Sequence, residues 1–181
     1  DVTAVDAYGV ALTDTDTEDI NLPLDMEVID VRKRVVGPIT DNTDGTFTLT
    51  YELEGRNLGN MNLQNVVLTD DLNAVYGAGN FTVDSMSITQ QPTSATAWLV
   101  PVNTAGVVTA TGNLDIDDSV LMQMTLTVSP ADLSSVYSNV VTMDAEDDNN
   151  APVQQDSDIE SVNFDQYANI EVDKRVDGEV T

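Results

Sequence analysis

Apolar residues recur at every second position in several segments of the 181-residue chain. Residues 47–53, 66–69, 122–128 and 141–143 follow this pattern, mostly with threonine between the apolar positions. A period of two residues is typical of a β-strand that buries one face and exposes the other. Because no stretch carries the 3.6-residue apolar period of an amphipathic helix, the sequence predicts an all-β protein.

Turn-forming residues separate these segments. Runs rich in Gly, Asn and Asp occupy residues 41–45, 57–60, 77–80 and 111–113. Such residues adopt the backbone conformations of tight turns at little cost. Several short strands joined by turns at this spacing predict an antiparallel β-sandwich.

The two ends of the chain resemble each other. Residues 2–40 are similar to residues 141–181, and the tripeptide Lys-Arg-Val stands at 33–35 and again at 174–176. Self-similarity at a fixed period is the signature of a tandem array. The chain is therefore predicted to hold one whole repeat of such an array, with parts of its two neighbours.

The repeat predicts three parts. Residues 1–24 are the end of a preceding repeat and its junction, residues 25–162 are the complete sandwich, and residues 163–181 are the first strand of a following repeat. Alone, each flanking segment exposes an unpaired strand edge. The predicted partners are neighbouring copies of the same repeat, joined head to tail by β-strand pairing.

Composition excludes several classes of function. The chain has no Cys and no His, which rules out a thiol nucleophile, a His-based triad and a zinc site with thiolate or imidazole ligands. Its 32 acidic residues against 6 basic ones give a net charge of −26, which repels nucleic-acid phosphates. No apolar run of about 18 residues occurs, so no membrane insertion is predicted for this segment.

A sequence motif lies in residues 46–72. It has the form Y-x-x-x-x-x-N-x-G followed by N-V-x-x-x-D-x-L, and it resembles the "conserved repeat domain" of bacterial and archaeal surface proteins, also called domain of unknown function eleven. The matching positions are Tyr51, Asn57, Gly59, Asn65, Val66, Asp70 and Leu72, together with Lys33, Val35, Tyr137, Ser138 and Asn139. The similarity covers about residues 26–160.

This resemblance implies an immunoglobulin-like antiparallel β-sandwich in a long surface stalk, adhesin or fibre. It also implies an extracellular or cell-surface location and no catalytic activity. The absence of Cys fits an extracellular protein that avoids unpaired thiols, although cytosolic proteins also lack them in some cases.

Acidic residues cluster where one repeat meets the next. Carboxylates two residues apart on a strand lie on the same side, and Ca²⁺ prefers six to eight oxygen ligands. The sequence therefore predicts Ca²⁺ as a cofactor that stiffens the junctions. An alternative is that these residues are solvated acidic linkers. The predicted ligands are Asp14, Asp16, Asp41, Asp44, Asp156 and Asp158.

A lysine stands in core register. Ile29, Val31 and Val35 share one face of the predicted first strand, and Lys33 lies on that same face. Asp70 follows Val66 and Leu68 at two-residue spacing, and Asn139 is in register with Val141 and Met143, so both also point inward. An unpaired buried ammonium costs several kcal/mol, so Lys33 needs a partner or must lose its charge.

Inward Lys33, Asp70 and Asn139 meet the requirement for a self-formed Lys–Asn isopeptide bond. A neutral amine would attack the amide carbon while a protonated Asp polarises the amide oxygen, and burial shifts both pKa values in the required directions. The alternatives are a plain Lys33–Asp70 salt bridge, or a lysine whose amine reaches the edge of the sheet.

These observations predict a structural module, with no enzymatic activity, of an extracellular fibre, stalk or adhesin. Strand pairing between repeats, Ca²⁺ and the isopeptide bond would stiffen it. The alternative is a ligand-binding module that recognises a glycan or a host surface. Clustered exposed aromatic residues would favour that alternative, but aromatic residues make up only 5% of the chain.

Overall fold

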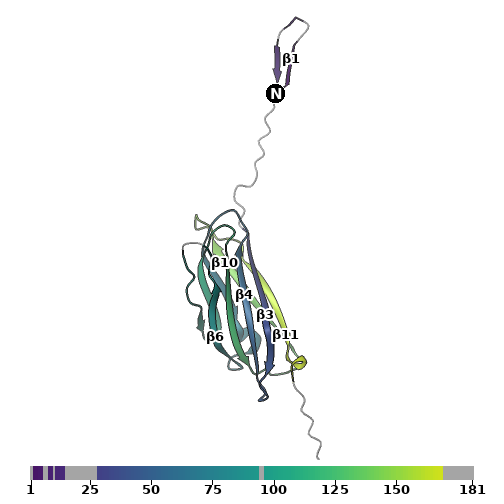
Figure 1. Cartoon of the computed structure of the whole chain (residues 1–181), viewed down its shortest axis with the longest axis vertical. Helices are drawn as coiled ribbons and strands as arrows, with labels where there is room; N and C mark the ends of the chain where they lie inside the picture. Colours follow the sequence, from purple (N-terminus) through teal and green to yellow (C-terminus); the bar gives the residue numbers. More distant parts are fainter. Residues whose placement is uncertain (1, 6–7, 10, 15–27, 94–95, 169–181) are drawn as a thin grey trace, which may run out of the picture.

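The computed structural model describes residues 2–5, 8–9, 11–14, 28–93 and 96–168 (Figure 1). Most of these residues belong to strands and the only helical elements among them are two short turns, so the all-β prediction is confirmed. The elements in chain order are β1 (Val2–Val5), β2 (Ala11–Asp14), β3 (Ile29–Asp41), β4 (Phe47–Asn57), β5 (Leu63–Asp71), α1 (Leu72–Tyr76), β6 (Phe81–Gln90), β7 (Val102–Thr104), β8 (Val107–Leu114), β9 (Ser119–Val128), β10 (Val136–Glu146), β11 (Asp156–Asn163) and the 3₁₀ turn η1 (Phe164–Gln166).

Two antiparallel sheets pack face to face. One has four strands in the order β3-β4-β9-β6, and the other has five in the order β11-β10-β5-β8-β7. Figure 1 shows the long strands running along the length of the sandwich, from one pole to the other. The predicted immunoglobulin-like β-sandwich is confirmed. β1 and β2 form a separate two-stranded antiparallel sheet.

The period-two pattern decides which face of each strand is buried. In β9 every second residue is buried, and the residues between them are half-buried on the outer face. Threonines on that face pair across strands, as where the Thr50 and Thr125 hydroxyls lie 3.0 Å apart. The apolar residues of both sheets form one core. This separation of faces is what the alternation predicts.

The core continues beyond residue 162, where the sequence predicted the sandwich to end. Phe164 in η1 is fully buried, and its ring packs against Phe47 at 5.0 Å and Tyr137 at 5.5 Å between centroids. The module therefore includes η1, because this aromatic ring closes one end of the core. Of the two flanking segments predicted to pair head to tail, residues 15–24 and 169–181 lie outside the described residues.

Trp98 fills a gap above one glycine of β8. Its ring is buried, and its indole N–H donates to the Asn113 carbonyl at 2.9 Å. A Cβ on Gly112 would lie 2.2 Å from Cδ1 of that ring, whereas a Cβ on Gly55 would meet only side-chain atoms at 3.2 Å or more. Glycine at 112 is therefore a requirement of the indole packing.

We predict that Gly112→Ala lowers the free energy of unfolding by about 1–3 kcal/mol, because the added methyl group overpacks the Trp98 site. Denaturant titration measures the change. Gly55→Ala is the matched control and should cost less, since its nearest neighbour is the flexible end of Met143. Equal losses in the two variants would contradict this account of Gly112.

Candidate functional site: a buried lysine, aspartate and asparagine

The structure brings Lys33, Asp70 and Asn139 together in the centre of the sandwich. They come from β3, β5 and β10, and their exposed fractions are 4%, 1% and 0%. The Lys33 ammonium forms an ion pair with Oδ2 of Asp70. The Asn139 amide nitrogen donates to the same oxygen at 3.4 Å. The three side chains thus form one polar cluster inside an apolar core.

Strand register explains why they meet. Lys33 follows Ile29 and Val31 on the inward face of β3, in the four-stranded sheet. Asp70 and Asn139 lie on neighbouring strands of the opposite sheet, where Asp70 stands across from Val141. The cluster therefore spans the gap between the two sheets. A one-residue slip of β3 would bury its arginines instead of Lys33.

Two tyrosines line the cluster, and sequence reasoning missed both as members of the site. The Lys33 Nζ lies 4.4 Å from the centre of the Tyr51 ring. The hydroxyls of Tyr51 and Tyr76 are 2.7 Å apart, and burial raises the pKa of both phenols. The sequence signal for Tyr51 was its alternation with Leu49 and Leu53, which only predicts an inward side chain. Its place near Lys33 follows from the β3–β4 ladder, where Tyr51 stands opposite Val35.

Burial sets the protonation of the cluster. It lowers the pKa of Lys33 and raises the pKa of Asp70, and their mutual attraction opposes both shifts. In both groups burial is the larger cause of the pKa shift. Compared with an exposed lysine–aspartate pair, the site therefore shifts the equilibrium toward a neutral amine and a neutral carboxylic acid. A neutral amine is a nucleophile, whereas an ammonium is not.

Two oxygens of the cluster have no hydrogen-bond partner among the described residues. They are Oδ1 of Asp70 and Oδ1 of Asn139, and both are buried. An unsatisfied buried polar atom costs about 1–3 kcal/mol. A plain Lys33–Asp70 ion pair therefore leaves these two buried oxygens without hydrogen bonds. The cost of burying them needs a chemical explanation.

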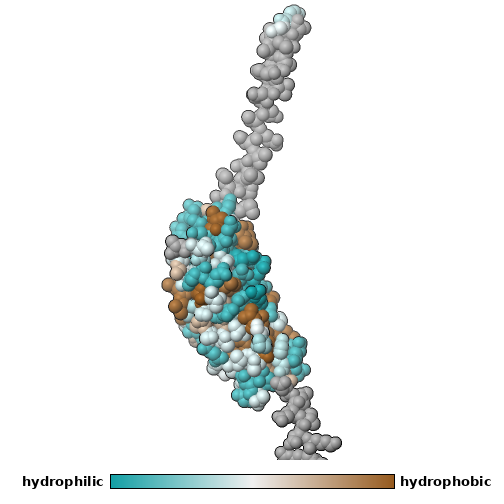
Figure 2. Space-filling view, in the orientation of Figure 1, coloured by the Kyte–Doolittle hydropathy of each residue, from teal (hydrophilic) through white to brown (hydrophobic). Residues whose placement is uncertain are grey.

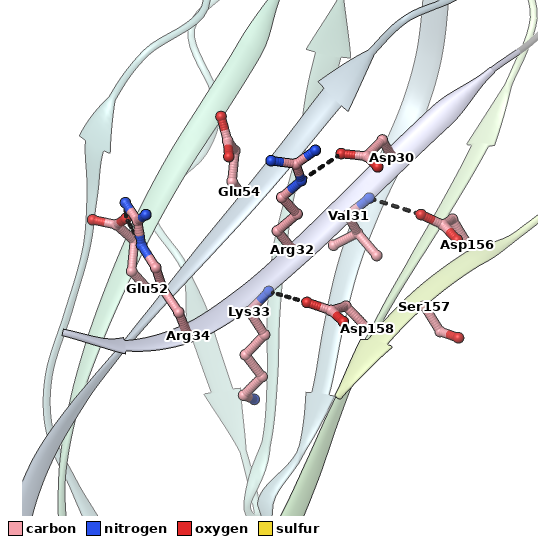
Figure 3. Close-up of a pocket in the computed structure, with 10 residues that line it drawn as sticks. All are labelled: Asp30, Val31, Arg32, Lys33, Arg34, Glu52, Glu54, Asp156, Ser157 and Asp158. Atoms are coloured by element: carbon pink, nitrogen blue, oxygen red, sulfur yellow. Dashed lines mark hydrogen bonds and ion pairs between the residues drawn. The ribbon is translucent and has the colours of Figure 1, made fainter. Parts of the chain in front are cut away.

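The carboxylates predicted to bind Ca²⁺ lie in separate places. Figure 3 shows Asp156 and Asp158 of β11 beside β3, where Oδ2 of Asp156 accepts from the Val31 N–H at 2.8 Å and Oδ2 of Asp158 accepts from the Lys33 N–H at 2.7 Å. A groove lined by charged side chains separates these two strand edges. These two carboxylates thus bind backbone amides of β3.

The other predicted ligands are elsewhere. Asp41 ends β3 and Asp44 lies in the turn that follows. They accept from the backbone N–H groups of Thr43 and Thr46, at 2.7 and 3.0 Å. Asp14 ends β2, and Asp16 is outside the described residues. Across the described ranges, no three or more acidic side chains form a group that would hold a metal. Calcium binding stays a prediction.

Comparison with solved structures identifies similar folds. BcpA, the major pilin subunit of Bacillus cereus, matches with a TM-score of 0.51 at 13% identity, over 88% of this chain and 46% of that one. The major pilin SpaD from Corynebacterium diphtheriae matches with a TM-score of 0.51 at 8% identity, over 72% and 34%. A cohesin module from a Clostridium perfringens family 33 glycoside hydrolase matches with a TM-score of 0.50 at 12% identity, over 76% and 97%.

These likenesses concern the fold, and the chain spans less than half the length of either pilin. The sequence matches no protein-family model and no curated protein. The resemblance to the conserved repeat domain therefore stays a prediction. Within the described ranges, no helix has the length and apolar character that crossing a bilayer requires.

We predict that Lys33→Met is strongly destabilising and that adding Asp70→Leu recovers stability. The single change leaves a carboxyl group buried without its cation, which costs about 3–5 kcal/mol, whereas apolar residues in both positions fill the space without a charge. Denaturant titration of the two variants tests this. Neither can form a bond through Lys33, so the comparison isolates the ion pair.

The pH dependence of the single variant follows from the direction of the Asp70 shift. Burial raises the pKa of Asp70, and Lys33→Met removes the group that lowers it. Folding then favours the protonated acid, so Lys33→Met should lose stability as pH rises through the unfolded-state and then the folded-state pKa of Asp70. A difference from the double variant that does not grow between pH 4 and pH 7 would contradict this reading.

Proposed function

We propose that the chain supplies a structural module to an extracellular fibre, stalk or adhesin, in which repeats join head to tail. The observation that carries this proposal is the buried cluster of Lys33, Asp70 and Asn139, which spans both sheets of the sandwich. Charged groups are costly in such a core, and an apolar set would serve stability at least as well. A covalent cross-link gives the cluster a purpose suited to a module under tension.

The proposed reaction joins Lys33 to Asn139. The neutral Lys33 Nζ attacks Cγ of Asn139, the Nζ–Cγ bond forms, and the Cγ–Nδ2 bond breaks. Protonated Asp70 donates a hydrogen bond to the amide oxygen and passes a proton from Nζ to the departing nitrogen, which leaves as ammonia. A half-turn of the Asn139 amide brings its oxygen toward Asp70, since the amide nitrogen now faces that carboxyl group at 3.4 Å.

Two features of the site support this chemistry. Burial favours the neutral amine and the neutral acid that the reaction needs. Once Asp70 carries a proton, its carboxyl group can donate a hydrogen bond and the amide oxygen of Asn139 can accept it, so these two oxygens gain partners. Nearly complete burial also excludes water, which would otherwise compete for the amide carbon.

The bond would change the mechanics of the module. It would connect β3 to β10 and close residues 33–139 into a covalent loop. On the chain-entropy estimate, a cross-link of that size stabilises the fold by roughly 4–5 kcal/mol. It would also carry tension between the sheets without a disulfide, in a chain that has no Cys.

Intact-mass measurement tests the cross-link. We predict that the folded protein is lighter than its sequence mass by one ammonia molecule, and that Lys33→Ala, Asp70→Ala and Asn139→Ala each restore the full mass. Lys174→Ala is the matched control, because Lys174 is the other lysine of the chain, and it should keep the mass loss. An unmodified wild-type mass would leave only the buried ion pair.

The ligand-binding alternative has less support. Among the described residues, the aromatic side chains with large exposure are Tyr8 and Tyr167. Figure 2 shows hydrophobic patches scattered among hydrophilic and neutral residues on the visible face, without one continuous apolar area. Tight glycan or protein recognition usually relies on clustered aromatic anchors. A structural role therefore accounts better for the surface that the structure describes.

The cellular role is tested by imaging. Antibodies against the sandwich, applied to the intact source cells, should label surface filaments or stalks at regular intervals, because a tandem array repeats the same module along its length. A preimmune serum is the control. Label that appears only after the cells are opened would overturn the extracellular assignment.

A further inference from the structure

Strand β11 is held on both of its edges. On one side it forms an antiparallel ladder with β10, from Val136 opposite Asn163 to Met143 opposite Asp156. On the other side it has no ladder, because its neighbour β3 belongs to the other sheet. There, the carboxylates of Asp156 and Asp158 accept hydrogen bonds from the backbone N–H groups of Val31 and Lys33 in β3, at 2.8 and 2.7 Å (Figure 3).

These bonds are stronger than ordinary ladder bonds. An ionised carboxylate that accepts a backbone N–H forms a shorter hydrogen bond, roughly twice as strong as a neutral one. Both aspartates are half-buried, which reduces their screening by water and salt. The N–H groups of Val31 and Lys33 would otherwise remain unpaired on the exposed edge of β3.

The two strands run parallel at this contact. Val31 meets Asp156 and Lys33 meets Asp158, so the residue numbers rise together along both strands. β3 begins at one pole of the sandwich, and β11 ends at the opposite pole (Figure 1). Tension along the chain therefore slides β3 and β11 past each other. Both hydrogen bonds must then break together, whereas a strand pulled sideways loses its bonds one at a time.

We propose that Asp156 and Asp158 form a load-bearing clasp, which holds β11 against β3 when the chain is pulled from its ends. The clasp is defined by these two carboxylates and the backbone N–H groups of Val31 and Lys33. It rests on the proposed function only in that the module carries tension. It adds a role for two acidic residues that the cross-link leaves unexplained.

The clasp protects the part of the module that a Lys33–Asn139 bond would leave open. That bond would close residues 33–139, but residues 140–164, which include most of β10 and all of β11, lie outside the loop. Pulled free, this segment of about 25 residues would lengthen the module by about 80–90 Å of contour. The ladder to β10 and the clasp to β3 are what keep it in place.

The chain holds a second copy of the acidic half of the clasp. Asp156-Ser157-Asp158-Ile159-Glu160 matches Asp14-Thr15-Asp16-Thr17-Glu18, at an offset of 142 residues. The sequence of the strand that receives the carboxylates also recurs, with Val172 and Lys174 at the positions of Val31 and Lys33. A clasp in each module of an array is what this recurrence indicates.

Single-molecule pulling of the 181-residue chain from its two ends tests the clasp. We expect Asp156→Ala/Asp158→Ala to unfold faster at constant force, on the order of tenfold for each acceptor lost. Asp156→Asn/Asp158→Asn keeps a neutral oxygen acceptor at both positions and should fall between this variant and the wild type. Asp117→Asn is the matched control for lost charge, because Asp117 is exposed in the β8–β9 turn, and it should match the wild type.

A second pulling direction separates load-bearing from general stability. With handles at residues 45 and 117, the load path excludes both β11 and the clasp. The Ala double variant should then change the unfolding rate far less than it does when the ends are pulled. Equal changes in the two directions would reduce the clasp to an ordinary stabilising contact, and no change when the ends are pulled would overturn it.

The same pulling traces test the clasp and the cross-link separately. With the Lys33–Asn139 bond, the contour gained on unfolding stops near 80–90 Å, whereas an unlinked sandwich of residues 29–164 gains about 450–490 Å. A full-length gain would disprove the cross-link and leave the clasp to be judged from the rates. A short gain with unchanged rates in the Ala double variant would disprove the clasp alone.

Discussion

The burial of one lysine constrains the rest of this structure. Lys33 lies between the two sheets with its ammonium on Asp70, so a strand of one sheet must stay in register with a strand of the other. Taking such a pair out of water costs several kcal/mol, and the cost is recovered only when the geometry is kept. The surrounding apolar core supplies the stability, whereas the polar cluster determines how the two sheets face each other.

Strand β3 carries this constraint in two directions. Its side chain at Lys33 points inward to Asp70, and its backbone N–H at the same residue points sideways to Asp158. One residue thus connects the interior of the sandwich to its open edge. A shift of β3 along its axis would break the ion pair and the edge hydrogen bonds together, which couples the core to β11.

Sequence reasoning succeeded where a local pattern reports burial. Period-two alternation located β4, β5, β9 and β10, and the inward register of Lys33, Asp70 and Asn139 followed from the same rule. It could not place Tyr51 and Tyr76 in the site, because their hydroxyl contact joins β4 to the short helix α1. That helix has only five residues and depends on its Asp71 cap, so it has no periodicity to detect.

The acidic residues show a second limit of prediction from the sequence. A pair of aspartates two residues apart has the same pattern whether it binds a cation or a neighbouring backbone. The choice for Asp156 and Asp158 depends on which strand edge lies beside β11, and that edge comes from a strand 125 residues earlier in the chain. Only the assembled sandwich reveals that the nearest donors are the amides of β3.

The basic residues of the described sandwich gather on β3 and its neighbour β4. The four cations of the described sandwich are Arg32, Lys33, Arg34 and Arg56, all on β3 and β4, and each pairs with a carboxylate. The chain has a net charge of −26, so most of its other acidic side chains have no cation to neutralise them. In the proposed array, like charges on neighbouring modules would repel, which favours separation and an extended array over lateral clustering. Such repulsion would stretch the proposed array along its axis, and the proposed clasp between β3 and β11 would resist that stretch.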